Sequence, residues 1–142
     1  MSSRPYIPEA VRRRVKQRAN ASCEYCLIPE LFSDAIYHID HVISIRQTGS
    51  SELSNLAYSC PTCNYYKGTN LSAYIADREL IVELFNPRLD DYSKHFKLLG
   101  TGKLEALSDK ASGTIILLKL NSPAKTEERR LLIIAGVINT SK

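Results

Sequence analysis

The stretches Cys23-Glu-Tyr-Cys26 and Cys60-Pro-Thr-Cys63 decide the fold of this 142-residue chain. Structural Zn²⁺ is held by four thiolate or imidazole ligands in a tetrahedron, and one Cys-x-x-Cys turn brings two sulfurs to the ion. Two such turns complete the set, so these cysteines predict a structural zinc site. The alternative is four reduced core thiols. The 33 residues between Cys26 and Cys60 must contain structure of their own.

The two cysteine pairs, Cys23/Cys26 and Cys60/Cys63, are called the cysteine frame below. Polar side chains lie between them in the sequence. Residues 35–43, Ala-Ile-Tyr-His-Ile-Asp-His-Val-Ile, are rich in β-branched and aromatic types and predict a strand. A polar loop follows at residues 47–52, and Leu53, Leu56 and Tyr58 lead into the second cysteine pair. A helix is expected from about residue 64 to residue 77, weakened by Gly68. The predicted order is therefore strand, loop, strand, helix.

The cluster suits phosphodiester hydrolysis. This reaction needs an activated water and a cation that stabilises the charge on the phosphate and on the leaving oxygen. A neutral imidazole is a good general base near pH 7, and His41 is the candidate. Asp40 and Asn64 offer hard oxygen ligands, which favour Mg²⁺ or Mn²⁺.

Residues 22–70 resemble the ββα-metal motif of HNH endonucleases, in the form stapled by a four-cysteine zinc. The resemblance is carried by Asp40-His41, Asn55-Leu, Cys-Pro-Thr-Cys-Asn64 and Lys67-Gly, which fall in the family's order. It implies that Asp40 and Asn64 hold the divalent ion and that His41 is the base. It also implies that Asn55 ties the loop between the strands, so that a backbone carbonyl orients the His41 ring.

His38 and Lys67 are two further candidates for the site. His38 lies two positions before Asp40, so strand alternation puts both on one face. It is a tentative third ligand of the divalent ion, with a structural histidine as the alternative. Lys67 lies one turn after Asn64 and is expected to steady the phosphate, with a surface lysine as the alternative. The family's second metal-binding histidine near this position is missing, so the ion is expected to be held loosely.

Charge is concentrated at the N-terminus. The net charge is +4, yet residues 1–20 hold six basic residues, Arg4 among them, against the single acid Glu9. Pro8 and the stripe of Val11, Val15 and Ala19 predict a helix over this segment. Such a basic element suits a nucleic-acid backbone, and the alternative is a solvated helix face. The candidate nucleic-acid-binding residues are Arg12, Arg13, Arg14, Lys16, Arg46 and Lys67.

The rest of the sequence carries weaker signals of structure and of family. Residues 79–85 and 112–120 are apolar runs that fit a strand or a helix, residues 95–107 predict a hairpin, and a helix is expected from residue 126 to about 138. Looser similarities between residues 84 and 121 resemble the tail of small free-standing bacterial HNH proteins. No apolar run is long enough to span a bilayer, and the first residues lack the pattern of a secretory signal, so a cytoplasmic location is expected.

The sequence thus predicts one α+β domain over residues 1–142. It has a zinc-stapled ββα-metal core, an N-terminal basic helix and a C-terminal α/β extension. The expected activity is metal-dependent cleavage or nicking of DNA, with RNA left open as a substrate and a targeting protein as a further partner. The alternative is a non-catalytic zinc module that binds nucleic acid or protein. The residues leave the oligomeric state open.

Overall fold

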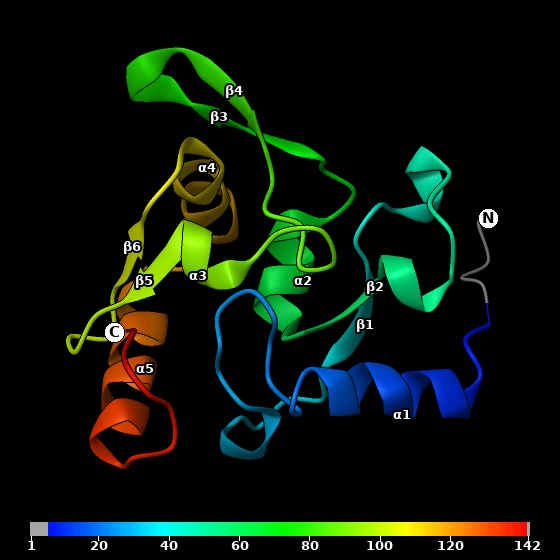
Figure 1. The fold of residues 1–142 in the computed structure, drawn as a ribbon, viewed down its shortest axis with the longest axis horizontal. Helices are drawn as coiled ribbons and strands as arrows, with labels where there is room; N and C mark the ends of the chain where they lie inside the picture. Colours follow the sequence, from blue (N-terminus) through cyan, green and yellow to red (C-terminus); the bar gives the residue numbers. More distant parts are fainter. Residues whose placement is uncertain (1–5, 142) are drawn as a thin grey trace.

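A computed structural model describes residues 6–141, so Arg4 of the basic segment lies outside the described residues. The described helices are α1 (Glu9–Arg18), α2 (Pro61–Lys67), α3 (Tyr92–His95), α4 (Asp109–Leu118) and α5 (Pro123–Ile134). The strands are β1 (His38–His41), β2 (Leu56–Ser59), β3 (Ser72–Ile75), β4 (Leu80–Glu83), β5 (Phe96–Leu98) and β6 (Leu104–Ala106). Short 3₁₀ helices occupy Glu30–Phe32, Ile45–Gln47, Leu53–Asn55 and Ala76–Arg78. The predicted mixture of helices and small antiparallel sheets is confirmed (Figure 1).

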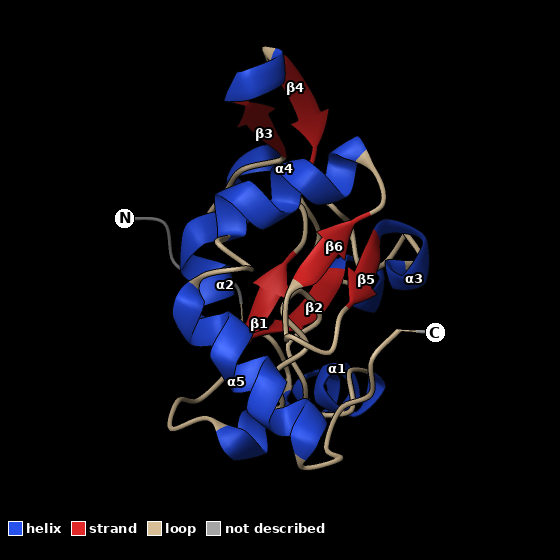
Figure 2. Cartoon of the chain, turned by 90° about the vertical axis from the view of Figure 1, so that its left-hand side faces the viewer, coloured by secondary structure: helices blue, strands red, loops and turns tan. Residues whose placement is uncertain are grey.

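The central unit is the hairpin-like pair β1–β2 with helix α2 beside it. β1 and β2 are antiparallel, with His38 opposite Ser59 and His41 opposite Leu56. Every residue of β2 is buried, and α1 contacts this strand. Figure 2 shows β1 and β2 side by side, with α2 next to them. The order β1, loop, β2, α2 is the strand, loop, strand, helix arrangement that the sequence predicts.

Helix α1 confirms the predicted N-terminal helix. Pro8 precedes it, Glu9 lies in its first turn, and Val15 is its fully buried residue. Arg18 fastens its C-terminal end to the core, because its guanidinium donates to the carbonyl oxygens of Leu53 at 3.0 Å and Leu56 at 2.5 Å. Arg18 therefore holds α1 against the segment that leads into β2.

Helix α2 is shorter than the sequence predicts. It begins at Pro61, where the Cys60 side chain caps the helix by accepting a hydrogen bond from the Cys63 amide. It ends at Lys67, because Gly68 has a φ of 52°, a conformation that glycine adopts without a Cβ clash. The predicted helix over residues 64–77 is wrong beyond this point, since β3 occupies residues 72–75.

The two ambiguous apolar runs take different structures. Residues 80–83 form β4, which pairs with β3, and residues 109–118 form helix α4, which packs against that pair (Figure 1). Gly113 permits the close approach, since a Cβ there would lie 2.4 Å from Val82 Cγ2. The predicted hairpin is confirmed by β5 and β6. The final helix begins at Pro123, capped by Ser122, and ends at Ile134.

A shared hydrophobic core joins the cysteine frame to the C-terminal extension. It contains all four cysteines together with Val15 of α1, Phe96 of β5, Leu118 of α4 and Leu132 of α5. Tyr92, Phe85 and Phe96 stack against one another in this region, with ring centroids 4.5–5.4 Å apart. No helix among residues 6–141 has the length and apolar character needed to cross a membrane.

Candidate functional site

The four cysteines meet as the spacing predicts. Their sulfur atoms all lie within 4.8 Å of one another, and all four side chains are buried. Each pair forms a tight turn in which the amide of the second cysteine donates to the sulfur of the first, at 3.4 Å. Four soft ligands at this separation fit a tetrahedral Zn²⁺, and a divalent cation would relieve the repulsion between buried thiolates.

Helix α5 brings positive charge to the sulfurs. Lys125 Nζ donates to Cys60 Sγ at 3.3 Å and to Cys26 Sγ at 3.5 Å. Burial alone would lower the pKa of Lys125, but the cysteine sulfurs together raise it. Hydrogen bonds from the other thiols lower the pKa of Cys60, and Lys125 lowers it further. Arg129, fully buried, donates to the Cys26 carbonyl oxygen at 3.4 Å. The C-terminal extension thus places positive charge beside the four clustered sulfurs.

Asp40 is a buried carboxylate with two protein partners. It is 4% exposed, and the Tyr25 hydroxyl donates to its Oδ2 at 2.7 Å. Lys67 Nζ lies 3.3 Å from Oδ1 and 3.2 Å from Oδ2. Burial raises the pKa of Asp40, while Lys67 and Tyr25 oppose this shift by stabilising the charged form.

Lys67 fits neither role expected from the sequence, a phosphate contact or a surface lysine. It is 2% exposed, so it is not a surface lysine, and it is not turned toward solvent to meet a phosphate. Its ammonium donates to the His41 carbonyl oxygen at 3.0 Å as well as pairing with Asp40. The physical reason is that a buried carboxylate on β1 needs a cation, and α2 places Lys67 within reach. Lys67 therefore links α2 to the end of β1.

His41 ends strand β1 and is half-buried. Its Nε2 lies 3.0 Å from Ser51 Oγ, within hydrogen-bonding distance. Burial lowers the pKa of His41, Asp40 raises it and Lys67 lowers it. The net shift is downward from 6.5, which keeps the imidazole neutral near pH 7. The ring partner in this structure is a side-chain hydroxyl, where the family resemblance led us to expect a backbone carbonyl.

Asn55 ties together the loop between β1 and β2. Its Oδ1 accepts from the Ile43 amide at 2.9 Å, and its Nδ2 donates to the carbonyl oxygens of Ile43 at 2.8 Å and Ser50 at 2.7 Å. Gly49 makes room for this arrangement, because a Cβ there would lie 1.7 Å from the Ile43 oxygen. The loop thus presents Ser51 to His41 from a fixed backbone.

Asn64 lies on α2, and His38 lies on β1, the strand that contains Asp40. Asn64 lies one turn before Lys67 on α2, and Lys67 reaches Asp40, so Asn64 belongs to the helix face nearest β1. The side-chain amide of Asn64 makes no hydrogen bond within residues 6–141, whereas its backbone N–H donates to the Cys60 carbonyl oxygen at 3.0 Å. His38 lies at the start of β1 opposite Ser59 and is half-buried. Among the described residues, only the cysteines form a group of three or more His, Cys, Asp or Glu side chains suited to a metal.

The candidate nucleic-acid-binding residues are mostly exposed. Arg13, Arg14 and Lys16 project from α1, and Arg46 lies in the 3₁₀ helix after β1. Arg12 Nε donates to the Ile7 carbonyl oxygen, and Lys16 pairs with Glu30 at 3.0 Å. Lys67 alone of the predicted set is buried.

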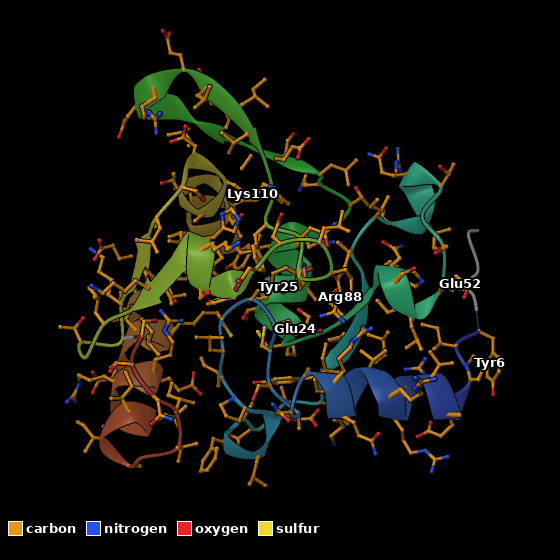
Figure 3. The ribbon with its side chains drawn as sticks, viewed as in Figure 1. Tyr6, Glu24, Tyr25, Glu52, Arg88 and Lys110 are labelled. Atoms are coloured by element: carbon orange, nitrogen blue, oxygen red, sulfur yellow. The ribbon has the colours of Figure 1, made fainter. Side chains whose placement is uncertain are left out.

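Three residues of the site were missed by the sequence reasoning: Tyr25, Ser51 and Lys125. Tyr25 lies between Cys23 and Cys26. This position could have marked it as a site residue, because the tight turn fixes it next to the cysteine cluster. Figure 3 labels Tyr25 near the centre of the view, and Glu24, which precedes it in the chain, forms an ion pair with Arg88. Ser51 and Lys125 carried no comparable signal, because one lies in a polar loop and the other in a distant helix.

One family of known proteins matches the part of the chain that contains this site. Residues 23–70 match the family described as HNH endonuclease, a range that includes both cysteine pairs, β1, β2 and α2. No curated protein and no solved structure matches the chain. The match supports nuclease activity on nucleic acids, and HNH nucleases generally use a divalent metal. Residues 23–70 of this chain are therefore similar to the HNH endonuclease family, and this range includes four cysteines in a cluster suited to zinc.

Proposed function

We propose that this protein is a metal-dependent endonuclease that hydrolyses DNA phosphodiester bonds, with His41 as the general base. The observation that carries the proposal is the His41 imidazole, half-buried at the end of β1 and held at Nε2 by Ser51. A general base must have a fixed ring orientation and a pKa near or below the working pH. The downward pKa shift of His41 meets the second condition.

The proposed mechanism assigns separate roles to the two ring nitrogens. Nε2–H donates to Ser51 Oγ, which leaves the lone pair of Nδ1 free to accept a proton from the attacking water. Asp40 and Asn64 would hold Mg²⁺ or Mn²⁺, with His38 as a third ligand. The bound ion supplies stabilisation of charge on the phosphate and the leaving oxygen. Lys67 and Tyr25 keep Asp40 charged and in place.

The proposal extends to substrate and setting. Four exposed basic residues contact the phosphate backbone: Arg13, Arg14, Lys16 and Arg46. The first three lie on α1, and Arg46 lies in the loop between β1 and β2. The whole chain acts as one nuclease domain, since the core of the HNH part continues into the C-terminal helices. Reduced cysteines suit a cytoplasmic location, and a targeting protein would supply sequence specificity.

Conversion of supercoiled plasmid by the purified zinc-loaded protein tests this function. We expect nicked product with added Mg²⁺ or Mn²⁺ and none without added ion, because charge stabilisation at the phosphate requires the ion. Nicked circles should precede linear DNA, if the ββα unit meets one strand at a time. A matched RNA substrate tests the choice of nucleic acid. Binding of DNA without any cleavage, with zinc present and the fold intact, would instead support the non-catalytic zinc module.

Replacing Ser51 with alanine is expected to slow cleavage without unfolding the protein. The variant removes the hydroxyl that holds His41 Nε2, and one hydrogen bond contributes about 0.5–1.5 kcal/mol, which corresponds to a rate loss of up to about tenfold. Cleavage rates at saturating Mn²⁺ would measure this loss. Threonine at this position keeps a hydroxyl and should restore part of the rate. Equal rates for Ser51→Ala and wild type would remove Ser51 from the mechanism.

A further inference from the structure

Tyr25 connects the cysteine frame to the carboxylate proposed to hold the catalytic ion. It lies between Cys23 and Cys26, it is 1% exposed, and its hydroxyl donates to Asp40 Oδ2 at 2.7 Å. The buried ring lies in the core, and the only carboxylate that its hydroxyl contacts in the described part of the chain is that of Asp40. This contact is formed by residues 15 positions apart in the sequence.

The backbone of Tyr25 is held from several directions. The Cys26 amide donates to Cys23 Sγ at 3.4 Å, and the Leu27 amide donates to the Cys23 carbonyl oxygen at 3.0 Å, so the turn is closed around Tyr25. The Tyr25 carbonyl oxygen accepts from the Tyr92 hydroxyl at 2.8 Å. The position of the Tyr25 backbone is therefore set by the cysteine turn and by the C-terminal extension, and its hydroxyl reaches Asp40 from there.

The two carboxylate oxygens of Asp40 differ in their hydrogen-bond partners. An ionised carboxylate accepts at about four lone-pair sites. Tyr25 and Lys67 both contact Oδ2, at 2.7 Å and 3.2 Å, whereas Oδ1 has the single contact to Lys67 at 3.3 Å. Oδ1 therefore keeps a lone pair for a metal, while Oδ2 is engaged by the protein.

We propose that Tyr25 is a positioning residue for the divalent-ion site. Its hydroxyl, held in place by the cysteine turn, fixes Asp40 so that Oδ1 faces the ion. The inference rests on the proposed function, in which Asp40 is a ligand of that ion. Hydrogen-bond partners of ligating carboxylates typically change metal affinity by about 10- to 100-fold. The structural zinc site thus influences the catalytic ion through one side chain, although no ligand is shared between them.

Manganese binding by the zinc-loaded full chain tests this role without reference to cleavage. Titration of Mn²⁺ followed by electron paramagnetic resonance would report the affinity of wild type, Tyr25→Phe and Asp40→Asn. We expect Tyr25→Phe to bind Mn²⁺ about 10- to 100-fold more weakly than wild type while keeping its zinc. Thermal melting of each variant would show that the fold is retained.

Tyr37→Phe is the matched control. Tyr37 is also buried in the same core, and its hydroxyl donates to the Ile28 carbonyl oxygen at 2.9 Å, so this variant loses a comparable hydrogen bond away from Asp40. It should bind Mn²⁺ as wild type does. An equal loss of affinity in Tyr37→Phe would attribute the effect to loosening of the core and overturn the inference.

The remaining outcomes separate this inference from the function on which it rests. If Asp40→Asn weakens Mn²⁺ binding but Tyr25→Phe binds as tightly as wild type, the inference is wrong and the proposed function stands. If Asp40→Asn binds Mn²⁺ as wild type does, Asp40 is not a ligand, and both the metal assignment and the role of Tyr25 fail.

Discussion

Replacing Cys60 with serine is expected to release zinc and unfold the protein. Cys60 contributes one of the four clustered sulfurs, and its side chain also caps helix α2. Structural zinc contributes about 10–16 kcal/mol to the folding of small zinc domains. The whole stability of a typical domain is only about 5–15 kcal/mol. The loss of one ligand can therefore remove most of the stability of this chain.

Zinc content measured by mass spectrometry and thermal melting followed by circular dichroism would check this result. Thr62→Ala is a suitable control, because the Thr62 hydroxyl lies 3.4 Å from Cys60 Sγ and is not itself a zinc ligand. That variant should keep its zinc and melt close to wild type. A Cys60→Ser protein with one zinc per chain and an unchanged melting temperature would show that the cysteines are not a structural metal site.

Replacing His41 with alanine is expected to abolish measurable plasmid cleavage and leave the fold intact. General-base catalysis contributes about 100- to 10,000-fold to a rate, so the residual activity should fall below the detection limit of a plasmid assay. The fold should survive, because His41 is only half-buried and its ring contact is a single serine in a loop.

His95→Ala provides the matched control for this variant. His95 is another half-buried histidine, and its Nδ1 lies 2.7 Å from Ser108 Oγ in the C-terminal extension, outside the matched residues 23–70. Its removal should leave the cleavage rate close to wild type. A His41→Ala protein that cuts as fast as wild type would refute the assignment of the base.

The pH dependence of cleavage follows from the state of His41. Burial lowers the pKa of this histidine below its usual value of 6.5. The neutral form, which accepts the proton, therefore predominates above that value and is lost as the pH falls. Plots of kcat/KM against pH should rise through a limb below pH 6.5 and level off above it. A limb centred well above pH 7 would point to another base.

Much of the site could be predicted from the amino-acid sequence, because the patterns that indicate it each span only a few consecutive residues. The two Cys-x-x-Cys turns each depend on four consecutive residues, and the structure brings all four sulfurs together. The strand containing Asp40 and His41 was expected from its β-branched composition, although β1 is shorter than the predicted segment. The apolar run at residues 112–120 could not be assigned, because helix or strand was decided by its packing against β3 and β4.

The amino-acid sequence by itself determined the set of four clustered cysteines, the order β1, β2, α2 and the match of residues 23–70 to the HNH endonuclease family. Only the tertiary structure decided which side chains hold the site in place: Tyr25 and Lys67 on Asp40, Ser51 on His41, and Lys125 on Cys60. These contacts join residues 10 to 65 positions apart. Their formation depends on how α2, α5 and the loop pack around the buried core, where a carboxylate or thiolate must find a partner, and no short sequence pattern encodes that packing.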